Sequence, residues 1–273
     1  MITNRPGIEL VDVRLDHPRG GAPLVQDASV RVTGGERVLI VGAAGVGTSR
    51  LVAAALGEVA LGGGRLEVLG RDVTRLRRAS LRLLRRRVGI VPQELSLLED
   101  RSAELNVVLP LEIDGIPRSL STIHAARVLA LLGLEAEAAV PVGALSMAAR
   151  QRVAVARALV REPGLLIADH PTSWQDADGA KLVCGAIDDA AERGAACLVF
   201  GRDPVLRGLA ERAGWRQLAL VHGLLRPLAQ VHGEALDQVL AVESAAAAPA
   251  QTVADPPSNV VPFPIVARPA GAR

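Results

Sequence analysis

Apolar and polar residues alternate along the first forty positions of the chain. Residues 8–15 (IELVDVRL) and 28–41 (ASVRVTGGERVLIV) combine this alternation with short runs of β-branched residues, a pattern typical of strands. The second segment ends in the unbroken apolar run VLIV, which is typical of a strand covered on both faces. We therefore expect antiparallel strands that lead into one buried strand.

Further along, helical patterns alternate with short apolar runs. Residues 79–91 (ASLRLLRRRVGIV) predict an arginine-faced helix followed by a strand. Further helices are predicted over residues 49–56, 120–133, 146–161 and 177–193, and further strands in PGLLIAD, ACLVFG and WRQLALVHGLLRPL, of which the last holds a pair. Strands that alternate with helices indicate an α/β fold with a largely parallel sheet covered on both faces.

The composition is that of a folded domain with a different C-terminal end. With 273 residues, 49% of them hydrophobic, the chain can bury one substantial core, or one core and a small subdomain. From Glu243 onward alanine and proline dominate, which predicts a disordered tail over residues 243–273. The apolar stretch VVPFPIV within it is compatible with a short docking motif.

The cysteines and the lengths of the apolar runs indicate in which cellular compartment the protein resides. Cys184 and Cys197 lie in apolar stretches without metal-ligand or disulfide spacing, which indicates core residues in a reducing environment. No apolar run reaches the roughly 18 residues of a membrane-spanning helix, and the start MITNRPGIEL lacks the regions of a signal peptide. We therefore expect a cytoplasmic protein.

A glycine-rich loop follows the buried strand. Residues 42–50 read GAAGVGTSR, which keeps the glycine frame of a phosphate-binding loop. Such glycines let successive backbone N–H groups and a helix N-terminus face nucleotide phosphates. Thr48 stands where the motif needs a lysine to reach the β and γ phosphates. The candidate nucleotide-binding residues are Gly42, Ala43, Ala44, Gly45, Val46, Gly47, Thr48, Ser49 and Arg50.

Four segments in a fixed order carry a resemblance to a known family. They are the glycine loop, GRDVTRLRRASLRLLRRRVGIVPQ, LLEDRSAELNVVLPLEIDG, and QRVAVARALVREPGLLIAD followed by PTS. On these segments, residues 8–227 resemble ATP-binding cassette (ABC) proteins, in particular the cell-division ATPase FtsE and its lipoprotein-release relatives. The resemblance implies an ABC-type P-loop NTPase domain over residues 1–242, with a RecA-like core, an antiparallel β flank and a helical subdomain at about 94–160.

The same resemblance implies ATP and Mg²⁺ as cofactors, bound between two cassettes arranged head to tail. It places Ser49 at the magnesium-ligand hydroxyl, Gln93 at the glutamine that senses the metal and couples to a membrane partner, and Asp169 at the acid that holds the metal through water. A hydroxyl, an amide and a carboxylate suit a hard cation that keeps most of its waters. Ser146 falls at the serine that reaches the nucleotide of the second cassette.

Five positions depart from the family pattern. Thr48 replaces the loop lysine, His170 the catalytic glutamate, and Arg202 the switch histidine. Met147 stands where the signature loop has a glycine, and His17 where an aromatic residue would stack on adenine. The chain therefore keeps the shape of the site and lacks the groups that neutralise, stack and hydrolyse.

Some of these residues have two interpretations. His170 could act as a base, since a histidine pKa near 6.5 suits that role, but its short reach favours an inactive catalytic position. Arg202 could face the phosphates in place of the missing lysine, or form a surface ion pair. Arg50 lies about 200° round the helix from Thr48 and should point elsewhere.

Three other features also have alternative interpretations. The arginines between Arg71 and Arg87 lack the interleaved aromatics of a nucleic-acid site, so we expect a solvated helix face, or one near anionic lipid headgroups. The apolar residues of LNVVLPLEI fit either a groove for the coupling helix of a membrane partner or subdomain core. Trp174 falls in a loop that crosses the cassette interface in the resembled family, where it fits an anchor or ordinary packing.

We therefore expect a nucleotide-binding subunit on the inner face of the cytoplasmic membrane, with weak or no ATP hydrolysis and a scaffolding or regulatory role. Its expected partners are an FtsX-like or other ABC-type membrane subunit and a second cassette. One alternative is an active half-site in a heterodimer, in which a complete cassette contributes the missing groups and this chain contributes Ser146. Another is a free regulatory protein without a membrane partner.

Overall fold

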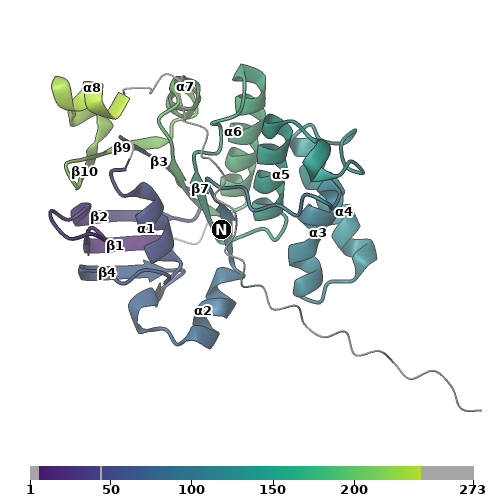
Figure 1. Ribbon diagram of the computed structural model, residues 1–273, viewed down its shortest axis with the longest axis horizontal. Helices are drawn as coiled ribbons and strands as arrows, with labels where there is room; N and C mark the ends of the chain where they lie inside the picture. Colours follow the sequence, from purple (N-terminus) through teal and green to yellow (C-terminus); the bar gives the residue numbers. More distant parts are fainter. Residues whose placement is uncertain (1–5, 44, 241–273) are drawn as a thin grey trace, which may run out of the picture. The chain divides into compact units, whose positions relative to one another are not determined.

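The computed structural model of the protein describes residues 6–43 and 45–240 (Figure 1). Ala44 of the glycine loop and the predicted tail over residues 243–273 lie outside these residues. Within them, no helix is both long and apolar enough to cross a bilayer.

The centre of the protein is a six-stranded sheet in the order β10-β9-β3-β8-β7-β6. Its strands are β3 (Arg37–Gly42), β6 (Val88–Val91), β7 (Leu165–Asp169), β8 (Ala196–Phe200), β9 (Arg216–Val221) and β10 (Leu224–Pro227). Neighbouring strands pair in parallel, except that β10 forms an antiparallel hairpin with β9. The α/β fold with a largely parallel sheet is confirmed, as is the predicted terminal pair of strands.

A second sheet of four strands, in the order β2-β1-β4-β5, is antiparallel throughout. It consists of β1 (Pro6–Leu15), β2 (Val25–Thr33), β4 (Gly63–Val68) and β5 (Arg71–Asp72). As predicted, β2 leads into the buried strand β3. The turn between them contains Gly35 with φ 88°, a left-handed conformation that glycine adopts without steric cost.

Helices connect the strands. They are α1 (Thr48–Ala55), α2 (Arg78–Arg85), α3 (Ala103–Ile113), α4 (Arg118–Leu131), α5 (Met147–Leu159), α6 (Ala177–Glu192), α7 (Pro204–Arg212) and α8 (Glu234–Leu240). The predicted helices correspond to α1, α2, α4, α5 and α6, with boundaries that differ by no more than the usual uncertainty of helix ends. The sequence predicts neither α7 nor α8, and it predicts α3 only as part of the helical subdomain at about 94–160.

Both faces of the central sheet are covered. Leu39 and Val41 of β3 belong to a core shared with α3, α4, α5 and α6, whereas Val38 and Ile40 belong to a core shared with α1 and the antiparallel strands. This division follows from the alternation of side chains along a strand. Figure 1 shows the result, with β1, β2, β4 and α1 on one side of the sheet and α5 and α6 on the other.

The stretch at about 94–160, in which the sequence predicts a helical subdomain, contains α3, α4 and α5 between β6 and β7. Val107, Val108 and Leu111 of α3 are buried in the core. For these three side chains, the structure decides between groove and core in favour of core. The exposed apolar side chains of this region lie elsewhere, for example Ile123 of α4.

Candidate functional site

The glycine loop connects β3 to α1 at the carboxyl edge of the central sheet. Gly45 and Gly47 have φ values of 76° and 109°, which side chains other than hydrogen rarely permit. A Cβ atom at Gly42 would lie 2.8 Å from Cγ1 of Val46. No side chain caps α1, which begins at Thr48. The helix therefore presents its first backbone N–H groups without a competing side-chain acceptor, as an anion site requires.

Thr48, the first residue of α1, is neutral and brings no positive charge to this loop. Two arginines are near enough in the sequence or the sheet to be considered instead. The Nε atom of Arg50 is buried, and it has no hydrogen-bond partner among the described residues. Arg202 follows β8, the strand next to β3, and is partly exposed. Since parallel strands end at a common edge, the fold places Arg202 at the same edge of the sheet as the glycine loop.

Asp169 is the last residue of β7 and is 3% exposed. Its Oδ2 accepts a hydrogen bond from Ser49 Oγ at 3.0 Å, and its Oδ1 lies 2.8 Å from His170 Nδ1. β8 separates β3 from β7 in the sheet. The fold therefore brings together Ser49 and Asp169, two predicted metal-site residues that are 120 positions apart.

The Ser49 hydroxyl and the Asp169 carboxylate fit a magnesium ion. Hydrated Mg²⁺ is usually held by one or two carboxylates together with substrate phosphates and water. No group of three or more His, Cys, Asp or Glu side chains converges anywhere in residues 6–43 and 45–240. The donor set therefore suits a metal that arrives with a nucleotide better than one bound by the protein alone.

His170 is held in an unusual backbone conformation beside this acid. Its φ is 52°, which is uncommon for a residue other than glycine, and its backbone N donates to Phe200 O at 2.8 Å. The side chain is 23% exposed, and Nδ1 is engaged with Asp169. Because a general base must reach the proton it removes, Nε2 is the ring nitrogen that could serve this role.

A buried glutamine that the sequence analysis did not single out joins this site to α5. Gln151 is 3% exposed, and its Nε2 donates to His170 O at 2.9 Å. Its Oε1 accepts from Trp174 N at 3.1 Å and from Gln175 Nε2 at 3.0 Å. Amide hydrogen bonds therefore tie α5 to the loop after β7. The signal that could have revealed Gln151 is an amide on the apolar face of a predicted helix.

The other predicted residues occupy separate places. Ser146 is the N-cap of α5 and accepts a hydrogen bond through its side chain. Gln93 follows β6 and is exposed. His17 follows β1, and its Nδ1 accepts a hydrogen bond from the backbone N of Arg19 at 3.1 Å. Among the described residues, hydrogen bonds thus join Ser49 and His170 directly to Asp169, whereas neither Gln93 nor His17 bonds to these three side chains.

Two large side chains near the start of α5 and after β7 are exposed. Met147 is 41% exposed and Trp174 is 55% exposed. The Trp174 ring is therefore not packed in the core of this chain. Its backbone N is nevertheless fixed by Gln151, so the side chain projects from a constrained loop.

Comparison with known proteins places the chain in a family. The family model described as ABC transporter matches residues 25–173, more than half of the chain. The methionine import ATP-binding protein MetN of Brucella abortus (strain 2308) is 33% identical over 225 residues, which cover 82% of this chain and 59% of that protein. The protein of the same name from Caulobacter vibrioides is 35% identical over 180 residues, covering 66% and 54%. The chain thus spans less than two thirds of these relatives.

Solved structures agree on the fold. The dimeric structure of a post-hydrolysis state of the ATP-binding cassette MJ0796, bound to ADP and Pi, superposes with a TM-score of 0.72 at 24% identity, covering 80% of this chain and 96% of that chain. The structure of cbiO1 from Clostridium perfringens, part of the ABC transporter complex cbiONQ, gives a TM-score of 0.70 at 21% identity over 81% and 87%. With the family model matched from β2 to the loop after Asp169, the chain belongs to the ABC transporter family and has the fold of an ABC cassette.

Proposed function

We propose that the chain is the ATP-binding subunit of a membrane-associated ABC complex, and that it binds ATP and Mg²⁺ weakly and hydrolyses ATP slowly or not at all. The observation that carries this proposal is Thr48 at the start of α1. The loop around it has the backbone geometry of a phosphate site, but the side chain brings no charge. The role that follows is scaffolding or regulatory.

The expected losses of ATP affinity and of hydrolysis rate are large enough to leave the chain with little ATPase activity. Removing one member of a buried charge pair costs about 2–5 kcal/mol, or about 30-fold or more in affinity. Lack of a positioned general base lowers the rate by about 10²–10⁴. His170 holds that position with Nδ1 engaged by Asp169. The two losses do not add simply, but either one leaves little turnover.

The residues that would hold the cofactors are those that the fold assembles. Backbone N–H groups from Gly45 to the start of α1 would face the phosphates, and Ser49 and Asp169 would hold the metal with its waters. A bound Mg²⁺ neutralises phosphate charge. Asp169 is already satisfied by Ser49 and His170, so metal binding has to compete with these contacts.

The partner we propose is an ABC-type membrane subunit, at the inner face of the cytoplasmic membrane, together with a second cassette. The relatives are named methionine import ATP-binding proteins, which favours an import complex. The FtsE-like segments of the sequence favour an FtsX-like subunit and cell division as the second candidate. In both cases residues at about 94–160 form the helical subdomain of the cassette.

A second candidate activity is an active half-site in a heterodimer. The observation that favours it is Ser146, which is present and caps α5. A complete cassette could then supply the missing lysine, glutamate and histidine, while this chain supplies Ser146 from across the interface. ATP turnover would then require the mixture of the two proteins.

The test is a calorimetric titration of the purified chain with ATP, with and without Mg²⁺, together with an ATPase assay. We expect weak binding and turnover near the background rate. The proposal is abandoned if the chain alone shows Mg²⁺-dependent turnover that Asp169→Asn abolishes. Turnover that appears only with a complete cassette and is lost in Ser146→Ala favours the half-site.

A further inference from the structure

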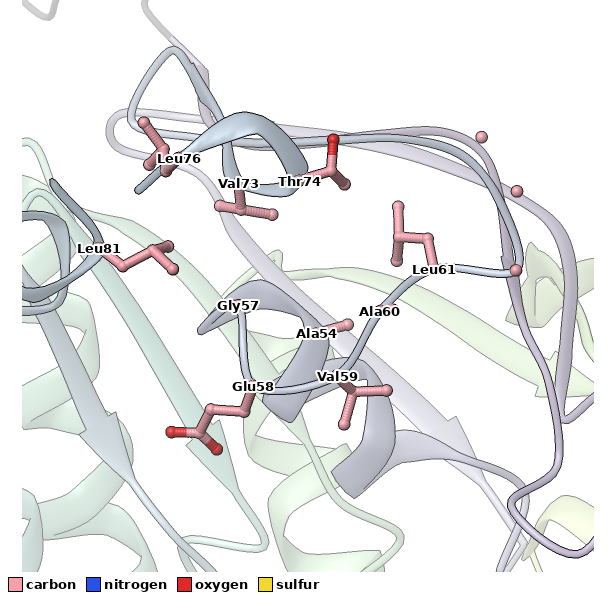
Figure 2. Close-up of a pocket in the computed structure, with 13 residues that line it drawn as sticks. Ala54, Gly57, Glu58, Val59, Ala60, Leu61, Val73, Thr74, Leu76 and Leu81 are labelled. Carbon is pink, nitrogen blue, oxygen red and sulfur yellow. The ribbon is translucent and has the colours of Figure 1, made fainter. Parts of the chain in front are cut away.

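The hollows outside the glycine loop differ in the charge of their linings. The hollow of Figure 2, of about 470 Å³, is formed by the end of α1, the segment after it and residues near α2. Leu61 and Leu81 give it apolar surface, and Glu58 is the charged side chain in its described lining. This hollow therefore offers no cationic group to a ligand. A second hollow, beside α8, has the opposite character.

The second hollow has a volume of about 350 Å³. It is formed by the segment that runs through the β9–β10 hairpin, the short helix Leu228–Gln230 and the start of α8. Figure 1 shows these elements side by side. Half of the lining residues are apolar, and Val231 among them is only 6% exposed. A volume and a lining of this kind suit a small organic ligand. We refer to this site as the α8 hollow.

The polar half of this lining consists of nitrogen-bearing side chains and contains no carboxylate. Its members are His222, Arg226, Gln230 and His232. All four are exposed, and none of their side chains bonds to another residue in the described part of the chain. Arg226 keeps its charge in a protein and opposes a metal cation beside the two imidazoles. The unpaired donors therefore favour an anion.

His222 occupies a backbone position that favours other residues. It is the first of the two turn residues between β9 and β10, with φ 48°, and Gly223 follows with φ 80°. Turns of this kind favour asparagine, aspartate or glycine. Gly223 O accepts a hydrogen bond from Gln26 N at 2.6 Å, so the turn is fixed against β2. The histidine thus holds an imidazole at the edge of the hollow, and backbone outliers of this kind cluster at ligand sites.

We propose that the α8 hollow binds a small organic acid, a carboxylate with an apolar substituent. The planar guanidinium of Arg226 can donate two parallel hydrogen bonds to a carboxylate, and the rings of His222 and His232 supply further N–H donors. The apolar half of the lining receives the substituent. A zwitterionic amino acid fits less well, because no acidic side chain lines the hollow to pair with its ammonium group. No lining residue belongs to the glycine loop, so the proposal is independent of nucleotide binding.

The test is an NMR titration of the full chain, labelled with ¹⁵N at glycine, with sodium hexanoate. Gly223 and Gly233 report on the hollow, and Gly45 and Gly47 report on the glycine loop. We expect shifts at the first pair, with a dissociation constant on the order of 1 mM for a ligand of this size. Acetate lacks the apolar part and 1-hexanol lacks the charge, so each should bind at least about tenfold more weakly.

Two variants test the named side chains. Arg226→Gln should weaken hexanoate binding about tenfold, the scale of one charged hydrogen-bonded pair. His222→Asn should weaken it about fivefold, although asparagine suits this turn better than histidine. The matched control is Arg212→Gln, which removes the charge of an exposed arginine of α7 outside the hollow. Its affinity should stay within about twofold of that of the parent chain.

Arg226→Lys separates loss of charge from damage to the fold. It keeps the positive charge without the planar fork, so its affinity should lie between those of the parent chain and Arg226→Gln. The proposal is wrong if the lysine and glutamine variants bind equally, if Arg212→Gln loses as much affinity as Arg226→Gln, or if acetate or 1-hexanol binds as tightly as hexanoate. It is also wrong if hexanoate shifts only Gly45 and Gly47, or if Zn²⁺ instead of hexanoate shifts Gly223 and Gly233.

Discussion

Nδ1 of His170 lies 2.8 Å from Oδ1 of Asp169, its neighbour in the sequence. The other oxygen of the same carboxylate accepts a hydrogen bond from Ser49 at 3.0 Å. The buried acid is therefore satisfied by the protein itself, without a cation. Since burying a carboxylate without partners is costly, the contacts with His170 and Ser49 offset the cost of burying the Asp169 side chain in a cassette that lacks the loop lysine.

Replacing Thr48 by lysine should strengthen ATP binding. The glycine loop already has the required backbone conformation, so the restored charge should contribute about 2–5 kcal/mol, or about 30-fold or more in affinity. The measurement is calorimetric titration with ATP in the presence of Mg²⁺. Thr48→Gln, a long but neutral side chain, is the control and should leave affinity near that of the parent chain. Equal affinity of all three proteins would show that the loop does not hold phosphate.

Gly47→Ala should destabilise the protein. The residue has φ 109°, and the new Cβ atom would lie 3.0 Å from Cβ of Leu24. Strain of this kind costs about 1–3 kcal/mol, measurable by urea unfolding. Gly185 of α6 is a matched control, since its Cβ atom would meet nothing within 4 Å and its φ is not positive. Gly185→Ala should be neutral or stabilise by up to about 1 kcal/mol.

Gln151→Ala should cost more than Gln175→Ala. The first change leaves the backbone N of Trp174 without its partner, at about 1–3 kcal/mol for a buried group, and it removes the hydrogen bond from Gln151 to the His170 carbonyl, which still accepts from Ser173. After the second change, Gln151 still accepts from Trp174 and donates to His170. Urea unfolding followed by tryptophan fluorescence measures both. Equal losses would contradict a central role of Gln151 in this network.

The two thiols should resist alkylation in the folded protein. Burial raises the pKa of Cys184 and of Cys197 to about 12. At pH 8 they are then about 10³-fold less ionised than a free cysteine of pKa about 8.5, and the thiolate is the reactive form. Labelling with iodoacetamide should be slow in buffer and fast in urea, which is the control.

The same pKa values predict how stability depends on pH. Because folding raises the pKa of both thiols above the unfolded value, the folded chain binds more protons between pH of about 8.5 and 12. The free energy of unfolding should therefore fall as pH rises through this range. Below it the thiols contribute no pH dependence. Replacement of both cysteines by alanine should flatten the alkaline decline.

The elements found from sequence are those with strong local signals. The alternation of residues 8–15 and the arginine-faced pattern of residues 79–91 correspond to β1 and to α2 with β6. The missed helix α7 also had a signal, because Asp203 caps it by accepting from Val205 N at 3.0 Å and is followed by proline at the first helical position. The apolar pattern of this segment is too short to predict a helix together with the cap.

The site could be predicted only in part. The sequence predicts its glycine loop and its acid, because backbone geometry and strand ends leave traces in the sequence. The resemblance placed His170 at the position of the catalytic glutamate, but the contact of its Nδ1 with Asp169 and its left-handed backbone conformation are seen only in the structure. The α8 hollow could not be found from the sequence either, because it forms only where α8 packs beside β9.

By itself the sequence determined the family, the strands of the central sheet with five of the helices, and the absence of a lysine at position 48, since these depend on local composition and spacing. Only the tertiary structure decided that Ser49 meets Asp169 across β8 and that Gln151 ties α5 to the loop after β7. The physical reason is that these contacts join positions far apart in the chain. Such contacts are fixed by how the layers pack, which no local pattern records.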